Sequence, residues 1–162
     1  MHLRKKLLAA MTILIASSHT VFAAGQSVNT LSHSPVGYWK TVDEFTGNPR
    51  SIVQISRDQN HLLTARVVKV FADAISGKPS LCRACTGDKR NQPIVGMVIV
   101  SGLALAEKQW ANGSILDPEN GRTYKCTARL IDDGKKINIH GYNGLPLFGH
   151  SQIWERVDLM AG

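Results

Sequence analysis

The sequence predicts an all-β fold, an antiparallel barrel or sandwich of about eight strands. From Val36 onward, short runs rich in β-branched and aromatic residues alternate with turn-forming Gly, Pro, Asn and Asp residues. Apolar and polar side chains alternate along several of these runs, as in a sheet with one buried and one solvated face. No stretch keeps a helical period over about three turns, so any helix is expected to be short.

Eight predicted strands follow one another along the chain, and the connection 72–94 is the least regular segment between them. In order they are 36–42, 50–57, 61–71, 95–100, 107–116, 121–131, 136–142 and 151–157. Alternation places Tyr124 and Cys126 on the apolar face of the sixth strand, and Ile137 and Ile139 on that of the seventh. These four side chains are therefore the candidate ligand-facing residues.

Residues 1–23 have the pattern of a cleavable export signal. A basic cluster at 4–6 precedes an apolar run at 7–16, and Val21 and Ala23 occupy the positions that a signal peptidase recognises. The apolar run is too short for a permanent anchor, which needs about 20 residues. We therefore expect cleavage near Ala23 and a periplasmic or extracellular protein.

The expected organisation after the signal is a flexible leader at 24–35, a single β-barrel domain at 36–157 and a short tail at 158–162. The signal holds three of the nineteen Lys and Arg residues and none of the twelve Asp and Glu residues. Cleavage therefore lowers the net charge from +7 to +4. The remaining charges are interspersed, unlike the clustered basic residues of nucleic-acid binders, and no second apolar run could cross a membrane. We expect neither a nucleic-acid partner nor a permanent membrane span, whereas the oligomeric state stays open.

Two Trp-bearing motifs lie in the first and last predicted strands. Gly37-Tyr38-Trp39 opens the first, and Trp154-Glu155-Arg156 lies in the last. The first and last strands of a barrel are neighbours, so Arg156 could cover an indole ring, a contact worth about 0.5–2 kcal/mol. Trp39, Trp154 and Arg156 are thus candidates for barrel closure. The combination resembles the G-x-W and terminal-strand Arg arrangement of lipocalin-like (calycin) barrels, either as the floor of a ligand site or as closure without a ligand.

A longer, ordered set of motifs resembles a family of secreted bacterial proteins, the domain of unknown function number 2147. The motifs are Gly37-Tyr38-Trp39, Cys82-Arg83-Ala84-Cys85, Pro93-Ile94-Val95-Gly96, Trp110, Ile115-Leu116-Asp117-Pro118, Gly121-Arg122-Thr123-Tyr124, Gly141-Tyr142, Gly144, Gly149 and Gln152-Ile153-Trp154-Glu155-Arg156. The resemblance implies a small exported β-domain and no established reaction. Many relatives carry Gly-Arg-Thr-Gln-x-Trp before the last motif, where this chain has His150 in place of the Arg.

Cys82 and Cys85 form a C-x-x-C motif in the irregular connection. In an oxidising compartment the expected state is a local structural disulfide. A zinc site would need two further ligands, which the scattered His residues do not offer at the usual spacing. A redox pair would be expected where a helix begins, whereas the residues that follow Cys85 are turn-like. We expect no metal and no cofactor, and the two alternatives for this motif are kept as hypotheses.

Cys126 and the acidic turn 117–119 are the residues that could carry catalysis. Cys126 lies on the apolar face of its strand, where a thiol is either core filler or a nucleophile that needs a nearby base. Asp117 and Glu119 could act as an acid–base pair. The segment Asp117-Pro118-Glu119-Asn120-Gly121 is also a strong hairpin-turn signal, which is the favoured interpretation.

The leading functional hypothesis is an exported, noncatalytic protein that binds a small, partly apolar ligand in or at the rim of the barrel. Barrels of about eight strands are just wide enough to hold one small ligand or to be filled by side chains. The first alternative is an envelope interaction or structural protein that contacts partners through 72–94 and 143–149. The second is an enzyme that uses Cys126 or the acidic turn.

Overall fold

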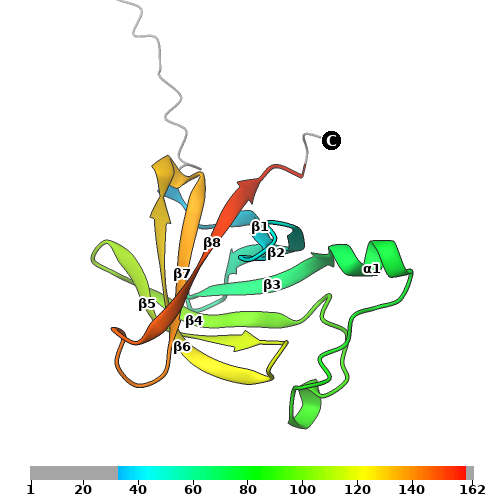
Figure 1. The fold of residues 1–162 in the computed structure, drawn as a ribbon. Coiled ribbons are helices and arrows are strands. Elements are labelled where there is room, and N and C mark those ends of the chain that lie inside the picture. The colour runs from blue at the N-terminus through cyan, green and yellow to red at the C-terminus, as the bar shows by residue number, and fades with distance from the viewer. Residues whose placement is uncertain (1–32, 160–162) are drawn as a thin grey trace, which may run out of the picture.

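The computed structural model describes residues 33–159, so the predicted signal peptide, most of the predicted leader and the last three residues of the tail lie outside it. The strands are β1 (Gly37–Val42), β2 (Pro49–Arg57), β3 (Leu63–Val70), β4 (Val98–Ala106), β5 (Gln109–Asp117), β6 (Arg122–Ile131), β7 (Lys136–Tyr142) and β8 (Gly149–Val157). Short helical segments are α1 (Phe71–Ser76), η2 (Gly87–Lys89) and η3 (Asp132–Gly134). Each strand pairs with the next and β1 pairs with β8, which closes an antiparallel barrel (Figure 1). The predicted barrel is confirmed.

The fourth strand differs most from the sequence prediction, because it begins at Val98 instead of residue 95 and extends to Ala106. A turn precedes it, closed by the Met97 N–H donating to the carbonyl of Ile94 at 3.1 Å. The β-branched run in the sequence ends where Ser101 and Gly102 begin, but pairing with β5 continues the strand beyond that point. Cross-strand hydrogen bonds therefore override the local composition here.

The main apolar core lies inside the barrel, and every strand contributes to it. Its buried members are Trp39, Val53, Ile55, Leu63, Ala65, Val67, Val100, Leu103, Trp110, Cys126, Ala128, Ile137, Ile139 and Trp154. On β6 and β7 these side chains alternate with more exposed ones, as the period-two pattern predicts. Among residues 33–159, no helix is both long and apolar enough to span a bilayer.

One end of the barrel is sealed where β1 meets β8. Trp39 and Arg156 are opposite each other in the β1–β8 pairing. The Arg156 guanidinium carbon lies 4.2 Å from the centre of the Trp39 ring, a cation–π contact. Trp39 is fully buried, and its indole N–H donates to the carbonyl of Pro35 at 2.9 Å. The ring therefore plugs the end of the core with its polar atom satisfied.

The Arg156 guanidinium also binds three backbone carbonyls, two in the segment before β1 and one in the β6–β7 connection. It donates to the carbonyls of Ser34 at 2.6 Å, Val36 at 3.2 Å and Gly134 at 2.7 Å. Partial burial lowers the pKa of Arg156, and these carbonyl oxygens compensate the cation for lost water. Gly37 allows the close approach, because it has a φ of +140° and a Cβ there would lie 2.9 Å from Nη1 of Arg156.

Removal of the Arg156 guanidinium tests the importance of this closure. Arg156→Met should lower the free energy of unfolding by about 3 kcal/mol, because three carbonyl acceptors and the ring face lose a charged partner. Urea unfolding followed by Trp fluorescence measures the loss. Lys40→Met is the control, since it removes the neighbouring cation that pairs with Glu155 at 2.7 Å on the solvated face. That exposed pair should be worth less than about 1 kcal/mol. Equal losses in the two variants would contradict the closure role.

Candidate functional site

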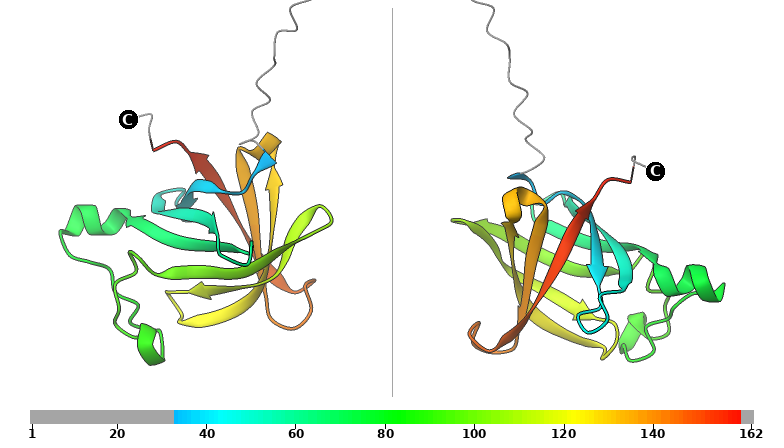
Figure 2. Two further views of the ribbon diagram at one scale, coloured as in Figure 1. Left: turned by 180° about the vertical axis from the view of Figure 1, so that it is seen from behind. Right: turned by 45° about the horizontal axis from the view of Figure 1, so that its top comes forward.

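The end of the barrel opposite Arg156 carries four of the seven connections between strands, including the longest. The strands run up and down in sequence order, so alternate connections lie at the same end. The connections 43–48, 71–97, 118–121 and 143–148 therefore share one end, away from the C-terminus (Figure 2). We call this end the mouth.

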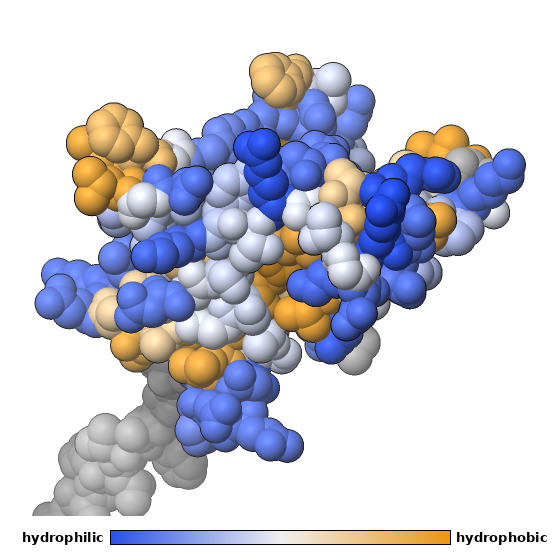
Figure 3. All heavy atoms as spheres, turned by 90° about the horizontal axis from the view of Figure 1, so that it is seen from below, coloured by the Kyte–Doolittle hydropathy of each residue, from blue (hydrophilic) through white to orange (hydrophobic). Residues whose placement is uncertain are grey.

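A cavity of about 1080 Å³ opens at the mouth. This volume is slightly above the range of about 300–1,000 Å³ that is typical of small-molecule sites. Its apolar lining includes Val67, Ile99, Ile115, Ile139 and Trp154. Figure 3 shows apolar surface in a hollow at the centre of one face, framed by hydrophilic side chains. The cavity thus combines an apolar interior with a polar edge.

The structure divides the four candidate ligand-facing residues into two pairs. Tyr124 and Ile139 line the cavity together with Trp154. Cys126 and Ile137 are fully buried in the packed part of the core and do not belong to the cavity lining. Alternation identified the face of each side chain, but not how far along the barrel axis it lies.

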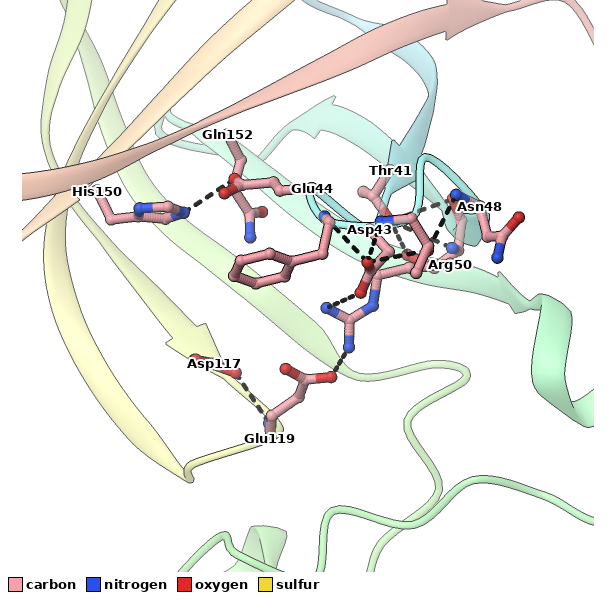
Figure 4. A network of polar contacts seen from close by, with 12 residues as sticks. Thr41, Asp43, Glu44, Asn48, Arg50, Asp117, Glu119, His150 and Gln152 are labelled. Carbon is pink, nitrogen blue, oxygen red and sulfur yellow. Dashed lines mark hydrogen bonds and ion pairs between the residues drawn. The ribbon is translucent and has the colours of Figure 1, made fainter.

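Arg50 is a mouth residue that the sequence analysis did not single out. In the β1–β2 pairing Thr41 faces Ser51 and Val42 faces Pro49, so Arg50 is the extra residue of a β-bulge. Bulges redirect side chains at barrel rims. The Arg50 side chain lies between Asp43, with Nη1 to Oδ2 at 3.8 Å, and Glu119, with which it forms an ion pair (Figure 4). The bulge therefore links the first and third mouth connections.

The β1–β2 connection is organised by Asp43. Its Oδ1 accepts hydrogen bonds from the backbone N–H groups of Phe45 and Thr46 and from the Thr46 hydroxyl. These bonds, the Thr46 backbone bond first, lower the pKa of Asp43. The next residue, Glu44, accepts a 2.9 Å contact from Nε2 of His150 on β8 (Figure 4). The contact thereby joins this connection to β8, the strand that pairs with β1.

Both carboxylates of the acidic turn have structural partners. Asp117 Oδ1 accepts the Glu119 N–H at 2.9 Å, and its Oδ2 accepts the Asn120 side-chain amide at 2.7 Å. That amide also donates to the Tyr124 hydroxyl at 3.0 Å. Glu119 pairs with Arg50. This is the hairpin-turn geometry that the sequence favoured, with Asp117, Glu119 and Tyr124 all on the cavity wall.

The disulfide between Cys82 and Cys85 is confirmed, and it docks the 71–97 connection onto the mouth. Both cysteines are buried in a small cluster with Met97 and Leu116 of β5. Gly121 has a φ of +70°, and a Cβ there would overlap the carbonyl oxygen of Ala84 inside the C-x-x-C loop. The disulfide loop therefore packs directly against the β5–β6 turn, where only glycine fits. Within the described residues, no three His, Cys, Asp or Glu side chains gather in a way that could hold a metal ion.

The Cys126 thiol is buried and free of any disulfide. Removal from water raises its pKa to about 12, because burial disfavours the thiolate. At neutral pH the protonated, weakly nucleophilic form therefore dominates. This is the chemistry of a small core side chain.

A closed, eight-stranded, up-and-down barrel with a cavity at one end defines the lipocalin-like class of proteins. Among solved structures, the chain is similar to protein HP1028 from Helicobacter pylori, described as belonging to the lipocalin family. The TM-score is 0.65 at 17% identity, over 78% of this chain and 85% of that one. At this identity the likeness concerns the fold.

The particular family is defined by sequence. Residues 37–156 match the model of the family described as "Uncharacterized protein conserved in bacteria (DUF2147)", and the chain belongs to that family. The match covers every strand of the barrel. No curated protein matches the chain in sequence.

The three cysteines should become accessible to a thiol reagent under different conditions. In the folded, oxidised protein at about pH 8, iodoacetamide should label none of them, because Cys82 and Cys85 are bonded and Cys126 is protonated. In urea one cysteine should be labelled, and in urea with reductant all three, as counted by intact mass. Rapid labelling of Cys126 in the folded state would contradict the inert thiol and revive the nucleophile hypothesis.

Proposed function

We propose that the protein is an exported, noncatalytic barrel that binds a small, partly apolar ligand in the mouth cavity. The observation that carries the proposal is the cavity itself, about 1080 Å³ with an apolar interior and a polar rim. A ligand that buries about 300 Å² of apolar surface there gains about 7 kcal/mol before the cost of association. We therefore expect dissociation constants of about 10 μM or weaker for simple apolar probes.

The noncatalytic part of the proposal is supported by the state of the two candidate catalytic features. The Cys126 thiol is buried and protonated. Asp117 and Glu119 are committed to the turn and to Arg50. Export is supported by the pattern of residues 1–23 and by the Cys82–Cys85 disulfide, because such bonds persist in oxidising compartments.

Gly141 offers a direct test, because it lines the cavity without a side chain. A Cβ there would meet Cγ2 of Ile115 at 3.4 Å, so a larger side chain extends into the cavity from an unstrained position. Gly141→Leu should weaken binding of the neutral fluorescent probe N-phenylnaphthylamine at least about tenfold by occupying its space. Fluorescence titration of the mature protein measures this effect.

Lys125→Leu is the matched control. Lys125 is exposed on β6, where it pairs with Tyr142 next to Gly141, and its side chain alternates with those of Tyr124 and Cys126. The change adds the same side chain to the outside of the barrel and should leave probe binding unchanged. Binding that survives Gly141→Leu, or no binding in the unmodified protein, would overturn the proposed function.

A second candidate function is supported by the exposed apolar side chains of the β7–β8 connection. Leu145 and Leu147 are 66% and 84% exposed and do not belong to the cavity lining. Such side chains at a loop tip favour contact with an envelope partner. In the double variant Leu145→Ser/Leu147→Ser, cross-linking to envelope proteins in cells should fall while probe binding persists. Unchanged cross-linking would remove this candidate.

A further inference from the structure

The charged side chains of the mouth cavity point to a class of ligand. We propose that the cavity prefers amphiphiles with a cationic head group over anionic amphiphiles that have the same tail. The inference rests on the ligand-binding function proposed above and specifies the chemistry of the ligand.

Arg50 is already paired with two carboxylates, which weakens its attraction for an anionic ligand. It lines the cavity, but its two terminal nitrogens already face carboxylates, Nη1 toward Asp43 and Nη2 toward Glu119. The hydrogen bonds that Asp43 accepts keep it ionised, as its lowered pKa indicates. An incoming carboxylate would have to displace one of these partners or approach both.

Negative charge outweighs positive charge in the lining. Arg50 is the one Lys or Arg side chain among the described residues of the lining, against the carboxylates of Asp117 and Glu119. His150, also in the lining, contacts a further carboxylate, Glu44. The basic side chains of the 71–97 connection lie outside the lining; they are Lys78, Arg83, Lys89 and Arg90. A cation at the mouth therefore meets an excess of carboxylates.

Glu119 is the carboxylate best suited to meet a head group. Its Oε1 is the atom paired with Arg50, and the side chain is 63% exposed. A carboxylate offers about four acceptor positions, so Oε2 can accept from a second cation. Both oxygens of Asp117, in contrast, accept hydrogen bonds within the turn.

The aromatic lining supports the same preference independently of the carboxylates. Tyr124, Phe148 and Trp154 line the cavity. Aromatic faces carry negative electrostatic potential and attract cations, quaternary ammonium groups in particular. The same rings provide apolar surface for the tail of an amphiphile. A cationic amphiphile is thus complementary to the cavity at both its ends.

The positive net charge of the protein opposes a preference for cations. A measured preference for cations therefore cannot be explained by the charge of the whole molecule. The full sequence carries a net charge of +7, and removal of residues 1–23 leaves +4. Non-specific attraction would therefore favour anions. At about 0.15 M salt, charges farther than about 8 Å from the head group are largely screened. A preference for cations under these conditions must arise at the mouth.

The experiment measures displacement of N-phenylnaphthylamine from the mature protein by decyltrimethylammonium, decanol and decanoate below their micelle concentrations. We expect half-displacement by decyltrimethylammonium at a concentration about tenfold lower than by decanoate, with decanol between them. Equal or stronger competition by decanoate would overturn the inference while leaving the proposed function intact. If none of the three displaces the probe, both fail.

The variant Glu119→Gln tests whether the preference for cationic head groups arises at the mouth or from the net charge of the protein. The change frees one side of Arg50 and should reduce the ratio between the decanoate and decyltrimethylammonium concentrations to about twofold or less. Glu107→Gln alters the net charge equally in the β4–β5 turn, at the sealed end of the barrel, and should leave the ratio unchanged. A ratio that persists in Glu119→Gln, or that falls equally in both variants, would overturn the assignment to the mouth.

Discussion

Closure of the sheet by Arg156 and Trp39 is the interaction on which the other features of the molecule depend. An open sheet of this sequence would leave β1 and β8 as unpaired edges, which could pair with other chains and promote aggregation. The guanidinium joins β8 to the carbonyls of Ser34, Val36 and Gly134 and covers the indole between them. Because the buried Trp39 ring plugs that end of the core, the opposite end can retain a cavity while the barrel keeps a continuous core.

Polar contacts within and between the connections hold the mouth in a defined shape. Asp43 organises the β1–β2 connection, and Asp117 organises the β5–β6 turn. The Cys82–Cys85 loop then packs on that turn at Gly121, which fixes the longest connection to the rim. A rim that is already ordered loses little conformational entropy when a ligand enters. This explains how a site can be built from connections and still have a defined shape.

Local patterns predicted the fold well and the site only in part, for physical reasons. Period-two alternation identifies which face a side chain occupies, so the interior positions of Tyr124 and Ile137 were accessible from sequence. Depth along the barrel axis depends on strand register, which separates Tyr124 at the cavity from Ile137 in the packed core. The role of Arg50 depends on a β-bulge that no local composition marks. The contact between Glu44 and His150 joins residues 106 positions apart, and only the closed topology brings them together.

The barrel and its mouth are therefore under different constraints. The fold is shared with a protein of 17% identity, because closure and alternation tolerate wide changes in sequence. The chemistry of the mouth depends instead on a few charged side chains, among which carboxylates outnumber the Lys and Arg side chains. His150 illustrates this, because its ring contacts the Glu44 carboxylate at 2.9 Å and so joins the β1–β2 connection to β8.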